Sequence, residues 1–127
     1  MLESEQENKI FTFAIIEKEL DGLIGLISLS NNETHKHGEL GYWIGNPFWN
    51  KGYGTEAAKL MLDFGFHFLD LNKISALAFS NNPGSWRIME KIGMTYEGEL
   101  RQHYVRFGQY IDVVQYGILR EEFLRDS

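Results

Sequence analysis

A short glycine-rich segment carries the strongest chemical signal in this sequence. Residues 49–55 read WNKGYGT and lie between an expected strand and an expected helix. Gly52 and Gly54 let consecutive backbone N–H groups converge at the start of the helix, where the helix dipole also favours negative charge. The segment therefore predicts a binding site for an anion, and above all for phosphate.

Three phosphate-binding motifs compete for this segment. A Walker loop fits Gly45 and Lys51, but Asn50 fills its second glycine position. A dinucleotide fingerprint fits residues 52–57, with Asp70 near the distance expected for a ribose-binding acid, but its glycines should follow the strand directly. The third motif is a pyrophosphate-binding loop for coenzyme A. A tight strand–helix connection without a ligand is the structural alternative to all three.

A carboxylate and two histidines lie upstream of the glycine-rich segment. Glu39 opens an expected strand and is a candidate general base, although a solvated strand-end charge is an equal alternative. His35 and His37 flank Lys36 in a polar loop that also contains Glu33. Such loop histidines are usually solvated, so we expect no metal site.

Strands and turns follow from the alternation of apolar residues and from turn signals. Asp21-Gly22 and Phe107-Gly108-Gln109 separate apolar runs and predict two hairpins. The expected strands cover residues 10–17, 23–29, 39–45, 73–79, 95–106 and 110–119.

Two helices complete the expected element order. The first starts near Thr55 and carries an apolar stripe at helical spacing, formed by Ala57, Met61, Phe64 and Phe68. The second begins at Pro83, runs to about Lys91 and stops at Gly93, a residue suited to the left-handed cap position. The order β-β-β-α-β-α-β-β predicts an α+β (mixed α/β) fold whose mixed sheet is flanked by helices.

Composition limits the classes of protein that this sequence can represent. The chain has 127 residues, of which 43% are hydrophobic, and this favours one domain over residues 1–127 with a polar tail at 1–9. It has no cysteine, which excludes a disulfide scaffold and a thiol nucleophile. A net charge of −6 disfavours nucleic acid and anionic lipid as partners. We expect a cytoplasmic protein without a membrane span.

Several short phrases together resemble the GNAT superfamily of acyl-CoA N-acetyltransferases. The glycine-rich segment is similar to that superfamily's motif A, [QR]-x-x-G-x-[GA], with Trp49 at the first position. The resemblance is strongest to the branch of ribosomal-protein-alanine and spermidine acetyltransferases, and it covers nearly the whole chain from about Ile10. The phrases that carry it are GYWI (41–44), WNKGYGTEA (49–57), NPGS (82–85), EKIGM (90–94), EGELR (97–101) and QYID (109–112).

The resemblance implies a GNAT fold with a mixed, mostly antiparallel sheet, and acetyl-CoA as co-substrate. It implies transfer of the acetyl group, by direct attack, to a primary amine of a small molecule or protein N-terminus. In such enzymes the strand before the loop splays from its neighbour and pairs with pantetheine, and a backbone N–H near Ile44 would stabilise the oxyanion. One of Tyr42 and Trp43 is expected to be ordinary core packing. The implied cofactor contacts are Trp43, Ile44, Trp49, Asn50, Lys51, Gly52, Tyr53, Gly54, Thr55, Asn82 and Ser85.

The leaving thiolate needs a proton, and the resemblance implies where it could come from. Many members carry a tyrosine four residues beyond the serine position, but this chain has Met89 there. The donor would then be Ser85, Tyr104 or water, with Glu39 as the candidate base. Asn82 would contact pantetheine. Both Asn82 and Ser85 could instead simply cap the helix.

The family normally has a further strand and helices before the strand that begins here at Ile10. Those elements usually form one wall of the acceptor site, so the first strand is expected to expose an apolar edge. We therefore expect a homodimer or larger assembly. The acidic charge favours a cationic amine as acceptor. A non-catalytic acyl-CoA-binding or regulatory module is the alternative function.

Overall fold

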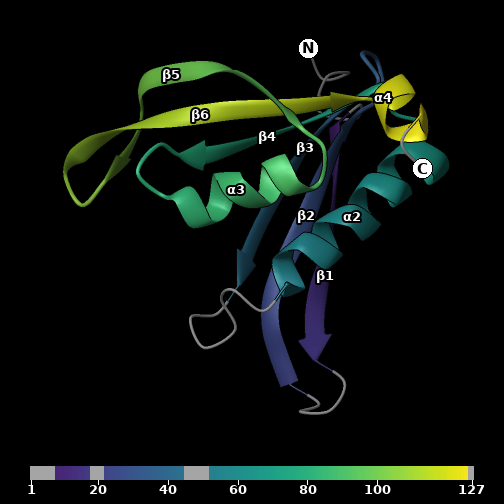
Figure 1. The fold of residues 1–127 in the computed structure, drawn as a ribbon, viewed down its shortest axis with the longest axis horizontal. Coiled ribbons are helices and arrows are strands. Elements are labelled where there is room, and N and C mark those ends of the chain that lie inside the picture. The colour runs from purple at the N-terminus through teal and green to yellow at the C-terminus, as the bar shows by residue number, and fades with distance from the viewer. Residues whose placement is uncertain (1–7, 18–21, 45–51, 126–127) are drawn as a thin grey trace.

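Six strands form a single mixed sheet in the computed structural model, which describes residues 8–17, 22–44 and 52–125. The strand order is β1-β2-β3-β4-β6-β5, and only the β3–β4 neighbours run parallel (Figure 1). This confirms the expected mixed, mostly antiparallel sheet. The strands are β1 (Asn8–Glu17), β2 (Gly22–Asn32), β3 (His37–Ile44), β4 (Lys73–Phe79), β5 (Thr95–Arg106) and β6 (Gln109–Leu119).

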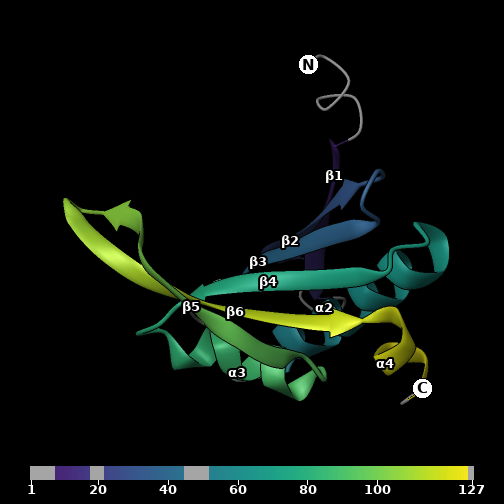
Figure 2. The same ribbon diagram turned by 90° about the horizontal axis from the view of Figure 1, so that it is seen from above.

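The helices pack on one face of this sheet. They are α2 (Tyr53–Asp63), which continues as the π-helix η2 (Phe64–Phe68), then α3 (Pro83–Lys91) and the short α4 (Arg120–Arg125). Figure 2 shows α3, α4 and the beginning of α2 on the same side of β4 and β6. The expected bounds of α3 are confirmed, and Gly93 adopts the predicted left-handed conformation at φ 95°. The helix α4 was not expected.

The prediction of the buried stripe on the first helix is partly wrong. Met61 is buried as expected, but Phe68 is 74% exposed, and the most deeply buried side chains are Ala58, Leu62 and Phe66. A π-helix has more residues per turn than an α-helix, so a stripe counted at α-helical spacing rotates away from the core in η2. Phe64 instead meets the β1 phenylalanines edge-on.

Successive residues of the central strands point to opposite faces of the sheet. Ile74, Ala76 and Ala78 of β4 lie in the apolar core beneath the helices, and we call this side the covered face. Ser75, Leu77 and the neighbouring Gln115 of β6 point to the other side. We call this second side the open face, because no helix in the described part of the chain lies on it.

The β5–β6 hairpin projects beyond the rest of the sheet as an arm (Figures 1 and 2). Its turn follows the prediction, with Phe107 at φ 52° and Gly108 at φ 75°. Two positive φ values in succession define a type I′ turn, whose twist matches that of the strands. Phe107 is 92% exposed at the tip. The first hairpin also pairs as expected, although its turn residue Asp21 lies outside the described residues.

Candidate functional site

The two parallel strands β3 and β4 separate after a short paired stretch. His37–Leu40 pairs with Lys73–Ala76, and β3 then continues to Ile44 while the rest of β4 pairs only with β6. Figure 1 shows the two strands diverging toward their carboxyl ends. The backbone of residues 41–44 is thus outside the β3–β4 ladder. Its N–H and C=O groups on that edge can bond to an extended ligand.

The helix α2 begins beside the end of β3, where the glycine-rich segment was expected to bind phosphate. Gly52 is the N-cap residue at φ 84°, and the first turn contains the buried Gly54 and the half-buried Thr55. The helix starts two residues earlier than expected. First-turn N–H groups have no acceptor within their own helix, which suits them to an anion. Trp49, Asn50 and Lys51 lie outside the described residues, as do the side chains of Trp43 and Ile44.

The helix α3 starts on the opposite side of the gap. Asn82 is its N-cap residue, and Asn82 makes no side-chain capping hydrogen bond. The Ser85 hydroxyl instead lies 3.2 Å from the hydroxyl of Tyr42. Neither residue therefore has the simple capping role, and the exposed Asn82 side chain is available to a ligand. Met89 is fully buried in the core, where it cannot serve as an acid.

The sequence predicts that one of Tyr42 and Trp43 is a core-packing residue, and the structure gives Tyr42 both packing and a polar contact. Its ring packs against the core, and its hydroxyl donates to the backbone carbonyl of Ser85 at 2.6 Å. Burial raises the pKa of the Tyr42 hydroxyl, and the hydrogen bond with Ser85 offsets part of that rise. The phenol is therefore neutral at physiological pH. The side chain connects β3 to the beginning of α3.

The other two predicted catalytic residues lie on the open face. Glu39 pairs with Ser75 across β3 and β4, and its exposed side chain shares the direction of the Ser75 side chain. Tyr104 contacts Phe79 edge-on at 6.2 Å, and Phe79 alternates with the core residue Ala78. Ser85, by contrast, meets Tyr42 on the covered face. The structure thus places Ser85 on one side of the sheet and Glu39 and Tyr104 on the other.

A polar network on the open face was not anticipated from the sequence. His37 Nε2 lies 2.9 Å from the buried Ser75 hydroxyl. Beside this pair, Lys73 bonds to Glu97 at 2.9 Å, and Gln115 donates to the same carboxylate at 3.0 Å. The only signal in the sequence was the alternation of polar residues with core residues in β4 and β6.

The same network shifts two pKa values. Burial lowers the pKa of His37, and the nearby Lys73 charge lowers it further. Burial alone would raise the pKa of Glu97, but hydrogen bonds from Lys73 and Gln115 outweigh it and leave the pKa below its usual range. At neutral pH the network therefore holds a neutral imidazole beside one ion pair.

The histidines of the expected polar loop do not form a metal-binding group in the described ranges. His37 bonds to Ser75, whereas His35 is exposed and only its backbone N–H bonds to Asn32. That no metal takes part in the reaction stays a prediction.

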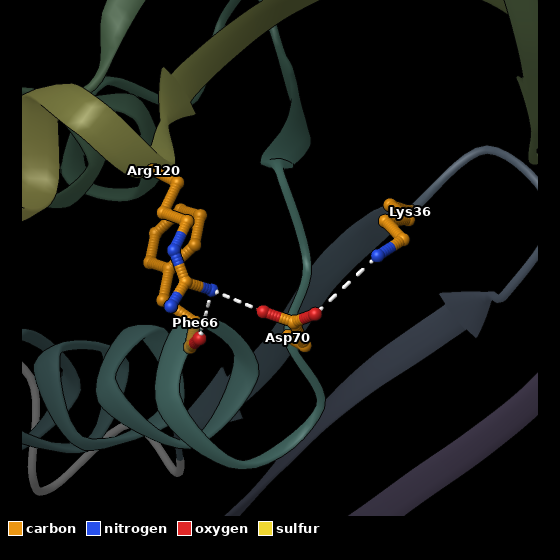
Figure 3. Close-up of polar contacts among 4 residues, drawn as sticks. All are labelled: Lys36, Phe66, Asp70 and Arg120. Carbon is orange, nitrogen blue, oxygen red and sulfur yellow. Dashed lines mark hydrogen bonds and ion pairs between the residues drawn. The ribbon is translucent and has the colours of Figure 1, made fainter.

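Asp70 does not lie where a dinucleotide-binding acid would be required. Asp70 follows η2, at the opposite end of the helix from Gly52. At a rise of about 1.5 Å per residue, the two residues are roughly 25 Å apart. There its carboxylate bonds to Arg120 at 2.8 Å and to Lys36 at 3.3 Å, while Arg120 also bonds to the Phe66 carbonyl (Figure 3). Asp70 therefore joins the end of η2 to the turn before β3 and to the start of α4, and the dinucleotide alternative loses its ribose ligand.

The arrangement combines three features that suit a long, phosphorylated ligand with a reactive end. A helix start can bind phosphate, the unpaired edges of β3 and β4 can bind an extended chain, and hydroxyl groups lie at the start of α3. A carboxylate on the open face can meet an amine at the far side of the gap. Within the described residues, no helix is long and apolar enough to cross a membrane.

Comparison with known proteins agrees with this geometry. Residues 1–95 match the family model described as "Acetyltransferase (GNAT) domain". The chain is 32% identical to uncharacterized N-acetyltransferase p20 of Bacillus licheniformis, over 92% of this chain and 66% of that protein. It is also 32% identical to spermidine N(1)-acetyltransferase of Escherichia coli (strain K12), over 83% of this chain and 55% of that protein.

A solved structure gives the same result for the fold. A point mutant of spermidine N-acetyltransferase SpeG from Vibrio cholerae superposes with a TM-score of 0.86 and 27% identity, covering 99% of this chain and 75% of that one. In the two sequence comparisons above, the chain spans two thirds or less of the length of each curated relative. On sequence, fold and site geometry together, this chain belongs to the GNAT acetyltransferase domain family.

Proposed function

We propose that this chain binds acetyl-CoA and transfers its acetyl group to a primary amine. The observation that carries the proposal is the divergence of β3 from β4 after Leu40, beside the start of α2. The backbone edge of residues 41–44 would pair with the pantetheine arm, and Gly52, Gly54 and Thr55 would lie at the pyrophosphate. The backbone N–H near Ile44 would stabilise the carbonyl oxygen during attack.

The proposed reaction is a direct transfer. The amine nitrogen attacks the thioester carbonyl carbon, the carbon–sulfur bond breaks, and its electron pair stays on sulfur. The cationic amine loses one proton before it attacks and a second as the amide forms. The thiolate takes up one of these protons and solvent takes up the other, so charge balances over the reaction. Glu39 is the proposed base on the amine side, and Ser85 or Tyr104 is the proposed acid on the thiol side.

The acceptor is proposed to be a cationic amine, of a small molecule or a protein N-terminus. The chain carries a net charge of −6, which attracts cations, and Glu39 is exposed on the open face. A relative is named as a spermidine acetyltransferase, which fits this class of acceptor. A cytoplasmic location and a single domain over residues 1–127 belong to the same proposal.

Two glycines offer a matched test of cofactor binding. Gly52 (φ 84°) and Gly108 (φ 75°) both have left-handed backbones, and an added Cβ would meet nothing within 4 Å at either. Alanine strains both positions similarly. We expect Gly52→Ala to weaken coenzyme A binding about tenfold by calorimetry, or roughly 1.4 kcal/mol, and Gly108→Ala to leave it unchanged. Equal affinities in the two variants would contradict the proposed site.

Thiol release across a panel of primary amines tests the transfer itself. Turnover of any amine supports the enzyme. Coenzyme A binding without turnover across polyamines, aminoglycosides and peptide N-termini would instead favour the alternative of a non-catalytic acyl-CoA-binding or regulatory module.

We also propose that the chain forms a homodimer or larger assembly through β1. Within the described residues β1 pairs only with β2, and Ile10 and Ile16 are 72% and 58% exposed beside the unpaired edge. An exposed apolar strand edge pairs readily with another chain. Light scattering coupled to size-exclusion chromatography should give at least twice the monomer mass, and a monomer would contradict the proposal.

A further inference from the structure

The contact between Tyr42 and Ser85 links the two walls of the gap. Tyr42 lies on β3 two residues beyond Leu40, the last residue that pairs with β4. Its hydroxyl lies 2.6 Å from the Ser85 carbonyl oxygen and 3.2 Å from Ser85 Oγ. Both contacts reach the first turn of α3, which follows the part of β4 that does not pair with β3. A strand residue thus determines where a helix hydroxyl lies.

Tyr42 and Ser85 are also the only hydroxyl side chains on β3 and α3. Met89, one turn after Ser85, is fully buried and has no proton to donate. The phenol proton of Tyr42 can take two positions, because either Tyr42 or Ser85 can be the donor in the hydrogen bond between their hydroxyl groups. When the phenol donates to the carbonyl, Ser85 Oγ donates to the phenol oxygen. When the phenol donates to Oγ, the Ser85 proton is released toward a neighbouring anion.

We propose that Tyr42 is a positioning residue for acetyl transfer, which holds Ser85 Oγ at the gap so that Ser85 protonates the departing thiolate. This inference rests on the proposed function. In the step, the carbon–sulfur bond breaks with its electron pair on sulfur, and the Ser85 proton moves to sulfur. The phenol proton moves to Ser85 Oγ, and the proton released by the amine restores the phenol through solvent.

The inference predicts that Tyr42 acts through Ser85, which a double-mutant cycle measures. The variants are Tyr42→Phe, Ser85→Ala and their combination, with Tyr110→Phe as the control because Tyr110 is 68% exposed on the hairpin arm. Tyr42→Phe keeps the ring that packs against the core. Calorimetry gives the dissociation constant of coenzyme A, and thiol release gives kcat at saturating acetyl-CoA.

We expect Tyr42→Phe to lower kcat about five- to tenfold, the usual effect of one lost hydrogen bond, while coenzyme A affinity changes less than about twofold. In the Ser85→Ala background the same change should have almost no further effect. Unchanged kcat in Tyr42→Phe, or effects that multiply, would overturn the inference alone. If the wild-type chain releases no thiol with any amine, the proposed function fails and this inference fails with it.

Discussion

The two faces of the same sheet differ in what their side chains are required to do. On the covered face Ile74, Ala76 and Tyr116 pack into an apolar core. On the open face Ser75, between Ile74 and Ala76 in sequence, is equally buried but bonds to His37. Neighbouring residues of one strand therefore have different roles: one packs in the apolar core and the next makes polar contacts. Stability should depend on volume on the first face and on charge and pH on the second.

The proposed chemistry follows the same division. The pair Tyr42 and Ser85 lies on the covered face, while Glu39 and Tyr104 lie on the open face. The proposed acid Ser85 and the proposed base Glu39 would thus act from opposite surfaces of the sheet. We propose that the thioester and the amine come together where β3 and β4 separate.

The largest expected effect compares two glycines of β3 that face opposite sides. An added Cβ at Gly38 would lie 2.5 Å from the Ser30 backbone oxygen and 2.8 Å from Leu71, whereas at Gly41 its nearest neighbour is the Ser28 hydroxyl at 3.3 Å. We expect Gly38→Ala to lower the free energy of unfolding by about 3 kcal/mol, and Gly41→Ala by less than about 1 kcal/mol. Urea denaturation measures both. Similar losses would contradict the distinction between the faces.

A smaller effect is expected from the ion pair of the open face. Lys73 and Glu97 are 2.9 Å apart with side chains about a third exposed, whereas Lys9 and Glu33 are 3.5 Å apart and more than half exposed. Lys73→Met should lower the free energy of unfolding by about 1 kcal/mol, because it leaves a partly buried carboxylate without its cation. Lys9→Met should cost less than about 0.5 kcal/mol. Equal costs would show that the open-face network adds no stability.

The pH dependence of stability should depend on His37. Its pKa in the folded protein lies below the ordinary value of 6.5. Below pH 6.5 the unfolded chain therefore binds a proton that the folded chain does not, so this group lowers stability as the pH falls. His37→Gln should flatten the decline in unfolding free energy between pH 6.5 and 5 by at most about 1.4 kcal/mol per pH unit. An unchanged slope would contradict the burial of His37. The exposed His103 on the hairpin arm provides the comparison variant, His103→Gln.

The smallest effect concerns a residue that belongs to neither face. Phe107 is 92% exposed and has φ 52°, which an aromatic residue adopts with strain and asparagine tolerates well. Phe107→Asn should raise the free energy of unfolding by about 0.5 kcal/mol and the melting temperature by about 2 °C. Differential scanning calorimetry would detect this. A loss of stability would indicate that Phe107 makes contacts beyond those with Arg106.

The sequence predicts the strands and α3 well, because local signals fix them. Pro83 and Gly93 mark the two ends of α3, and Gly108 marks the second hairpin. The π-helix has no comparable local signal, so the stripe that includes Phe68 is assigned to the wrong face. The helix α4 has only six residues, which is too short for an amphipathic pattern.

The site divides into a predictable and an unpredictable part for a similar reason. Gly52 and Ser85 belong to short local motifs, and the structure places each at a helix start. The Tyr42–Ser85 contact joins residues 43 positions apart, so it depends on tertiary packing. The face on which Tyr104 lies depends on the register of β5, which shifts between Leu100 and Tyr104. The alternation of apolar and polar residues in the sequence does not reveal such a shift in strand pairing.

The short pairing of β3 with β4 also makes the sheet two three-stranded halves joined by a narrow seam. Four residue pairs, from His37 and Lys73 to Leu40 and Ala76, hold the halves together within the ladder. Few hydrogen bonds must open for one half to swing against the other, so amide exchange should be fastest along this seam among the central strands. A molecule that bonds to both free edges would act as a seventh strand. Its binding would then be read out as slowed exchange at Gly38, Glu39 and Leu40, the paired residues just before the edge that it contacts.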